Sequence, residues 1–143
     1  MLDTNVLLDL WLFDDPRVHG LREAICSRRL RALRSADCDA EFADVLGRTG
    51  FGLDDSGRSR ILARWSASSD AIEGVRPAPL VCADAGDQKF LDAAFSAGAR
   101  WLLTRDKALV LSQALGIAPY DALIDGFSPG FSSAEIDQLF RVI

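Results

Sequence analysis

The sequence predicts an α/β domain with a mainly parallel sheet. Short apolar segments of strand character alternate along the chain with segments whose apolar residues recur at helical spacing. The chain has 143 residues, 49% of them apolar, and contains no internal repeat, which fits one domain with a substantial core. Strands that alternate with helices are typical of βα units, in which the strands run parallel.

The N-terminal part of the chain predicts a very short strand, two helices and a second strand. Leu2 alone can form a strand ahead of Asp3, and residues 6–12 are apolar enough for a buried helix. An aspartate followed by Pro16 predicts the start of a helix over residues 17–27. The alternation LRALRS then predicts a strand over residues 30–35.

The middle of the chain predicts two helices and a further strand. Asp39 is placed to cap a helix over residues 41–48, and Asp54 or Asp55 opens the next helix. Residues 71–76 precede a proline-rich loop and form a possible strand.

The C-terminal part repeats the alternation. The segment QKFLDAAFSAG predicts a helix that ends at Gly98. Residues 100–104, RWLLT, form a nearly continuous apolar run, as expected of a strand covered on both faces. A helix from Asp106 to about residue 115, a strand over residues 116–120 and a short tail helix complete the prediction.

Composition narrows the classes of protein to consider. No run of eighteen apolar residues occurs, and no basic region precedes the apolar N-terminus, so neither a membrane span nor a signal peptide is expected. Cys26, Cys38 and Cys82 form no close pair, which favours reduced thiols and therefore the cytoplasm. His19 is the only histidine, which excludes a histidine-rich zinc site.

The charge balance is acidic and unusual in kind. The net charge is −5, and 17 aspartates stand against four glutamates. Aspartate is a good helix cap, so this excess indicates either many helix starts or carboxylates gathered around a metal ion. Acidity argues against a nonspecific nucleic-acid binder, but it leaves room for a basic rim around an acidic site.

Four carboxylates occupy positions where a parallel sheet binds ligands. Asp3 and Asp106 follow predicted strands, Asp87 opens a predicted helix, and Glu41 lies one turn into the helix after LRALRS. Each alone could be an ordinary cap or a solvated helix residue. Together they would repel one another unless a cation neutralised them, and oxygen ligands suit Mg²⁺ or Mn²⁺. Magnesium in proteins usually meets phosphate, so a phosphoester substrate is predicted.

Three motifs together resemble the PIN domain family, and within it the VapC-like toxins of bacterial toxin–antitoxin pairs. They are LDTNVLLDL, the glutamate of DAEFADVLGR, and DAGDQKFLDAAFSAGARWLLTRDKALVL. The resemblance covers roughly residues 2–111 of a single domain over 1–143, with residues 112–143 as a C-terminal strand and helix extension. It implies a three-layer α/β/α sandwich around a mainly parallel sheet of four to five strands.

The same resemblance implies a function and a site. It implies metal-dependent hydrolysis of RNA phosphodiester bonds with Mg²⁺ or Mn²⁺ as cofactor. The ligands and catalytic residues would be an acidic quartet: Asp3, Glu41, Asp87 and Asp106. Kinship also implies a small antitoxin protein and a homodimer as partners.

Flanking polar residues extend this predicted site. Asn5 and Thr104 match polar positions of the motifs, which implies support for Asp3 and Asp106, although both could serve turn chemistry alone. Arg105, beside Asp106, is a candidate for contact with the substrate.

The resemblance has one departure. Family members carry several apolar residues before the first aspartate, whereas only Met1 and Leu2 precede it here. We therefore expect that the sequence starts late and that the first strand is short.

Two other functions stay open at this point. A phosphatase of the haloacid dehalogenase type also begins with an aspartate after a strand, but it needs a second acid where this chain has Asn5. A PIN-like module that binds or assembles without catalysis is the other alternative.

Arginines and aromatic residues have two readings each. Four arginines could form a rim for the RNA backbone or a solvated face: Arg28, Arg29, Arg31 and Arg34. The three tryptophans are predicted to anchor the core or an interface. Trp11, Leu12 and Phe13 could form an exposed partner surface.

Overall fold

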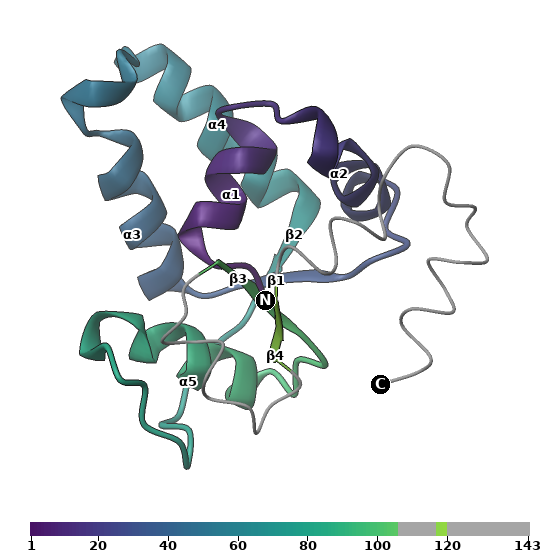
Figure 1. Cartoon of the computed structure of the whole chain (residues 1–143), viewed down its shortest axis with the longest axis vertical. Coiled ribbons are helices and arrows are strands. Elements are labelled where there is room, and N and C mark those ends of the chain that lie inside the picture. The colour runs from purple at the N-terminus through teal and green to yellow at the C-terminus, as the bar shows by residue number, and fades with distance from the viewer. Residues whose placement is uncertain (106–116, 120–143) are drawn as a thin grey trace.

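The computed structural model describes residues 1–105 and 117–119, and within them it contains five α-helices and four short strands (Figure 1). The helices are α1 (Thr4–Trp11), α2 (His19–Cys26), α3 (Ala36–Leu46), α4 (Asp55–Ser68) and α5 (Gln88–Ser96). The strands are β1 (Ala32–Arg34), β2 (Ser69–Ala71), β3 (Leu102–Thr104) and β4 (Ile117–Pro119). Three short 3₁₀ helices are η1 (Pro16–Val18), η2 (Thr49–Phe51) and η3 (Ala85–Asp87).

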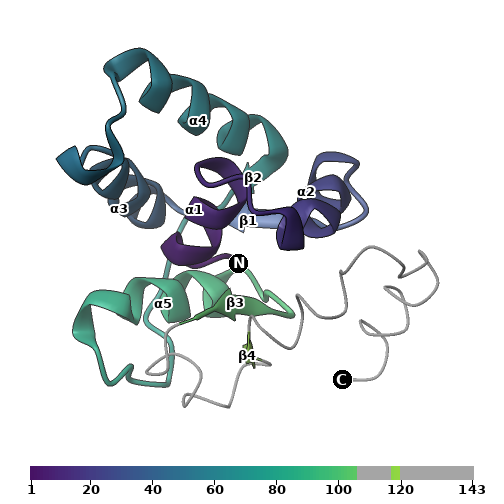
Figure 2. The ribbon, with the colours of Figure 1, turned by 45° about the horizontal axis from the view of Figure 1, so that its top comes forward.

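The described strands form two parallel pairs, β1 with β2 and β3 with β4. Leu2 adds a single parallel bridge to Leu103, so the N-terminal residues lie between the two pairs, as Figure 2 shows. The predicted α/β class with parallel strands is confirmed. The single sheet of four to five strands and the three-layer sandwich stay predictions, because the described strands form separate pairs. The expected helix after Asp106 and the tail helix lie outside the described residues.

The position of β2 corrects the prediction of a strand over residues 71–76. Strand β2 begins directly at the end of α4, where the hydroxyls of Ser68 and Ser69 both donate to the Trp65 carbonyl. Pairing with the three residues of β1 ends at Ala71, and Gly74 then adopts a positive φ of 65° that an extended strand cannot hold.

The start of α3 corrects a second prediction. Ser35, rather than Asp39, caps the helix, and its side chain accepts a hydrogen bond from the Cys38 amide. Asp39 instead accepts from Trp65 Nε1 at 3.0 Å and pairs with Arg34 at 2.5 Å. The helix therefore begins five residues before Glu41, whose side chain reaches back from the second turn.

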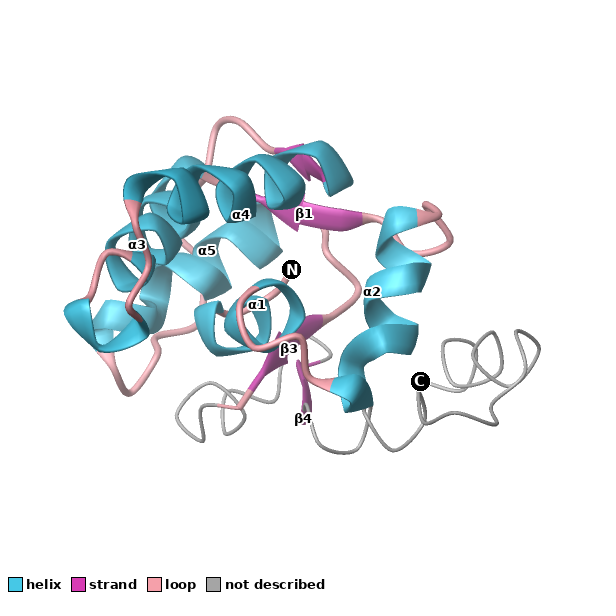
Figure 3. Cartoon of the chain, turned by 90° about the horizontal axis from the view of Figure 1, so that it is seen from above, coloured by secondary structure: helices cyan, strands magenta, loops and turns pink. Residues whose placement is uncertain are grey.

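Burial fixes α1 in the molecule. Figures 2 and 3 show α1 between α3 and α2, and Val6, Leu7 and Leu10 on it are at most 1% exposed. Trp11 and Trp65 are also buried, as predicted for core anchors, and Trp11 cannot belong to a surface for partners. The N-terminal end of α1 is consequently held in one place, and that end begins at Asp3.

Two further features concern membrane-spanning helices and the cysteine thiols. In the described part of the chain, no helix combines the length and apolar character needed to cross a membrane. All three cysteines are free thiols, and burial raises the pKa of Cys38 to about 11, which makes that thiol unreactive.

Candidate active site

Asp3 is a buried carboxylate at the edge where strands end. Its amide donates to the Leu103 carbonyl at 2.9 Å, and its carbonyl accepts from the first turn of α1. Its side chain, in a residue only 3% exposed, accepts from Thr104 Oγ1 at 2.7 Å and from Asn5 Nδ2 at 3.5 Å. Thr104 is itself fully buried at the end of β3. The carboxylate is thus held in place by neighbouring side chains.

The environment of Asp3 opposes its negative charge. Burial is the main reason why the pKa of Asp3 lies above its ordinary value, and the charge of Glu41 acts in the same direction. Hydrogen bonds from Thr104, the Thr4 amide and Asn5 oppose this rise but do not cancel it. Asp3 and Glu41 are therefore close enough to repel one another.

Glu41 reaches this edge from α3 and is held by two donors. Thr4 Oγ1 donates to Glu41 Oε1 at 2.7 Å, and Lys89 Nζ lies 2.5 Å from Oε2. Thr4 follows Asp3 in the chain, so one short turn positions both acids. Glu41 is half-buried, with 27% of its side chain exposed.

Lys89 brings a positive charge to the same place. Its ammonium contacts the Gly86 carbonyl as well as Glu41. Burial lowers the pKa of Lys89, but the hydrogen bond and charge of Glu41 outweigh that effect, so the pKa lies above its usual value. The charge of Asp87, at the end of η3, adds to the rise and shows that Asp87 also lies near the ammonium.

The four predicted acids are therefore only partly brought together. Asp3 lies near Glu41, and Glu41 and Asp87 both lie near Lys89. Asp106 is outside the described residues. Among residues 1–105 and 117–119, no three histidine, cysteine or acidic side chains stand close enough to hold a metal ion.

The chemistry of the donors nevertheless fits a hard divalent cation. The carboxylates of Asp3 and Glu41 come from separate elements, and burial together with the charge of Glu41 disfavours the charge on Asp3. A cation would relieve that repulsion, and carboxylate oxygens are the ligands that Mg²⁺ and Mn²⁺ prefer.

Arg105 extends the polar edge beyond Thr104. Its guanidinium lies 3.1 Å from Asp9 Oδ2, and the Asp9 side chain is only 7% exposed. Arg105 is thus paired with a residue of α1, while its own side chain keeps 36% exposure. Its predicted contact with a substrate stays a prediction.

Lys89 and Thr4 are the site residues that the sequence reading missed. A signal for Lys89 was present, because it is one of only two lysines in a chain with 14 arginines and it lies two residues after Asp87. Thr4 lies between Asp3 and Asn5 in the first motif, but nothing in its identity indicates that its hydroxyl reaches Glu41.

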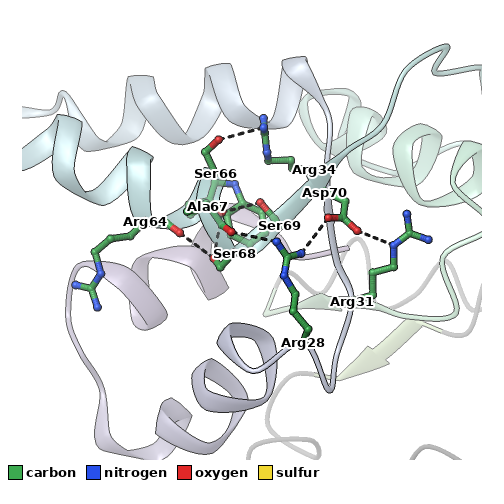
Figure 4. Close-up of polar contacts among 10 residues, drawn as sticks. Arg28, Arg31, Arg34, Arg64, Ser66, Ala67, Ser68, Ser69 and Asp70 are labelled. Carbon is green, nitrogen blue, oxygen red and sulfur yellow. Dashed lines mark hydrogen bonds and ion pairs between the residues drawn. The ribbon is translucent and has the colours of Figure 1, made fainter.

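The predicted arginine rim is largely paired with acids of the protein. Arg28 and Arg31 both hold Asp70, with distances of 2.9 and 2.7 Å, as Figure 4 shows. Arg34 pairs with Asp39 and donates to Ser66 Oγ at 3.1 Å. These contacts favour a solvated face over a dedicated phosphate rim.

A cavity in the described part of the chain lies beside the N-terminal residue. It measures about 240 Å³ and has Met1, Leu30, Arg31 and Trp101 among its walls. None of its lining residues is acidic, whereas Asp3 and Glu41 lie at the strand edge described above.

Comparison with known proteins gives one result. A family model described as a PIN domain matches residues 1–108, a range that includes Asp3, Glu41, Asp87 and Asp106. No curated protein and no solved structure matches the chain.

Proposed function

The chain belongs to the PIN domain family, whose members are generally nucleases, and on that premise we propose that it is a Mg²⁺- or Mn²⁺-dependent endoribonuclease. In this proposal Asp3, Glu41, Asp87 and Asp106 hold the cation at the carboxyl edge of the strands. The substrate is RNA, and the reaction is hydrolysis of a phosphodiester bond.

The observation that supports this proposal most is the pair of Asp3 and Glu41. A fold gains nothing in stability from two carboxylates that repel one another, when one of them is buried and its pKa is raised for that reason. Such perturbed groups cluster at functional sites, because binding or catalysis requires them there. A nuclease that binds a divalent cation gives both acids a purpose.

The residues of the chain would divide the work as follows. Thr104 fixes one oxygen of Asp3, and Thr4 fixes one oxygen of Glu41, so that both carboxylates are oriented before the substrate arrives. A bound cation would lower the pKa of a water molecule and stabilise charge on the phosphate. In this proposal Arg105, whose guanidinium is paired with Asp9, contacts the RNA backbone.

The biological setting proposed is the toxin of a bacterial toxin–antitoxin pair in the cytoplasm, with a small antitoxin as partner and a homodimer as the assembly. This part of the proposal depends on the motif resemblance alone. Phe13 is 57% exposed and makes an edge contact with Phe51, which offers an apolar surface for such a partner.

The competing phosphatase gains no support from the site. The position two residues after Asp3 carries the amide of Asn5, which donates to the Asp3 carboxylate and cannot serve as a second acid. The non-catalytic binding module is separated from the nuclease by experiment.

The test is cleavage of a mixed panel of labelled RNAs with Mn²⁺ or EDTA, comparing the parent protein with Asp3→Asn and Asp70→Asn. Asp70 is a partly exposed carboxylate paired with two arginines, so its variant is a matched control for loss of one acidic charge. We expect Mn²⁺-dependent cutting by the parent and by Asp70→Asn, and a loss of at least about a hundredfold in Asp3→Asn.

Other outcomes decide against the proposal or part of it. Equal cutting by all three proteins would identify a contaminating nuclease and remove the support for Asp3. RNA binding without cutting under any metal condition would favour the non-catalytic module.

A further inference from the structure

We propose that Lys89 is a substrate-contacting residue, which Glu41 holds at the carboxylate edge and releases to an RNA phosphate when a cation binds Glu41. The inference rests on the proposed nuclease function. It assigns to the one lysine in the described part of the chain a role that neither the motifs nor the family match assigns.

The Lys89 ammonium lies beside the Glu41 carboxylate. Lys89 is the second residue of α5, and its ammonium lies between Glu41 Oε2 and the Gly86 carbonyl. The Lys89 side chain is 26% exposed, so the group lies at the opening of the site and is not enclosed within the core. A phosphate that approaches the carboxylates would meet this ammonium at the surface.

Lys89 and a bound cation would compete for the same carboxylate of Glu41. Thr4 occupies Oε1 of Glu41, and Lys89 occupies Oε2. A cation that binds Glu41 would share or displace the ammonium, because both neutralise the same charge. Lysine is a compact charge on a flexible four-carbon stem, so it can turn to a new anion without movement of the helix. The scissile phosphate would be that anion, since a metal-bound phosphate lies next to the metal ligands.

Helix α5 is held in the core without the ion pair between Lys89 and Glu41. Phe90 and Leu91 are fully buried and anchor α5 in the core. Gln88 and Asp92 add hydrogen bonds from α5 to the preceding loop. A partly exposed ion pair adds little to stability, so a purely structural role explains poorly why a positive charge is kept among acids.

The first experiment measures Mn²⁺ affinity by calorimetry for the parent, Lys89→Met and Arg60→Met. Arg60 is an exposed residue of α4 whose guanidinium donates to Ser56 Oγ one turn earlier, so its variant controls for loss of one positive charge. Removing a cation that competes for Glu41 should tighten Mn²⁺ binding about threefold or more in Lys89→Met, and leave Arg60→Met within about twofold. Unchanged or weaker Mn²⁺ binding in Lys89→Met would overturn the proposal.

The second experiment measures RNA affinity in EDTA, where no metal-dependent cleavage occurs, for Glu41→Gln, Lys89→Met and the double variant. Glu41→Gln frees the ammonium, so RNA should bind about threefold or more tightly than to the parent. The gain should disappear when Lys89→Met is also present. An equal gain in both backgrounds would mean that the lysine does not contact RNA. Lys89→Arg, which keeps the charge, should retain most of the RNA affinity.

The two readouts separate this inference from the nuclease proposal. Failure of the parent to cleave RNA would remove the proposed function, but Mn²⁺ affinity would still report whether Lys89 competes for Glu41. Cleavage by the parent, with Mn²⁺ and RNA affinities unchanged by Lys89→Met, would overturn the inference alone. Folding of each variant is checked by its cooperative thermal transition.

Discussion

The carboxylates of Asp70 and Asp3 have opposite electrostatic environments, and their pKa values shift in opposite directions. Around Asp70, Arg31 and Arg28 donate to separate carboxylate oxygens, and hydrogen bonding by Arg31 is the main reason why the pKa of Asp70 is lowered. Around Asp3, burial raises the pKa, and the charge of a second acid, Glu41, acts in the same direction. The Asp70 carboxylate is partly exposed and paired with two arginines, whereas the Asp3 carboxylate is buried and no lysine or arginine is among the groups that set its pKa.

In an acidic protein, this difference indicates which carboxylates are candidates for a functional role. A carboxylate whose charge is matched by arginines adds to solubility and local order, and the fold explains it fully. A buried carboxylate next to a second acid is a cost that the fold alone does not explain. With 17 aspartates in the chain, this contrast selects Asp3 more sharply than the mere presence of acidic residues does.

The strongest way to sharpen the contrast within the site is to remove the hydroxyl that holds Asp3. Thr104→Val keeps the shape of a fully buried side chain but deletes the donor to Asp3 Oδ2. We expect RNA cleavage and Mn²⁺ affinity to fall about tenfold to a hundredfold, the usual cost of losing a residue that orients a metal ligand. Both are measured on the purified variant.

Thr104→Ser provides the matched control, because it restores the hydroxyl and removes only a methyl group. It should recover most of the affinity and cleavage. If Thr104→Val and Thr104→Ser lost activity equally, the hydrogen bond to Asp3 would not be the reason.

A smaller effect is expected on the stability of the metal-free protein and on its pH dependence. The pKa of Asp3 is raised in the folded state, so the folded protein holds that proton more tightly than the unfolded chain does. The stability from this group is present at low pH and is lost as the pH rises through the raised pKa. Asp3→Asn does not titrate, so in EDTA it should melt above the parent at pH 7.5, and the difference should shrink as the pH falls towards 4.

Asp70→Asn should behave in the opposite way. Its pKa is lowered by the two arginines, so its contribution to stability is present above the unfolded pKa and is lost on acidification. The Met1 amine titrates as well, since burial lowers its pKa to about 5, but it is common to all these proteins and drops out of the differences. A parent that is more stable than Asp3→Asn at pH 7.5 without metal would contradict the view of Asp3 as an unbalanced charge.

Much of the fold followed from the sequence because its signals are local. Apolar runs and helix-start signals predicted α1, α2, α4 and α5, and the run RWLLT predicted β3. The cap of α3 was wrong because Ser35 and Asp39 are both good caps, and a tertiary partner, Trp65, claims the second of them. Strand β2 was misplaced because its register depends on pairing with β1, which the local sequence does not contain.

The candidate site was predictable in part for the same reason. Asp3 and Glu41 were placed together by the argument that strand ends and following helices share one edge. Lys89 was missed because a lysine on a helix is usually solvated, and only the packing of α5 against α3 brings it to Glu41. The role of Asp106 stays a prediction, because that residue lies outside the described part of the chain.

We propose that the acids around Asp3 bind a divalent cation, whereas Asp70 and its two arginines do not. Thermal unfolding with increasing Mn²⁺ tests it most directly, since a ligand that binds only the folded state at a hundred times its Kd adds about 2.7 kcal/mol of stability. We expect the Tm to rise with Mn²⁺ for the parent and for Asp70→Asn, and to rise little or not at all for Asp3→Asn. An equal rise in all three proteins, or no rise in the parent, would contradict it.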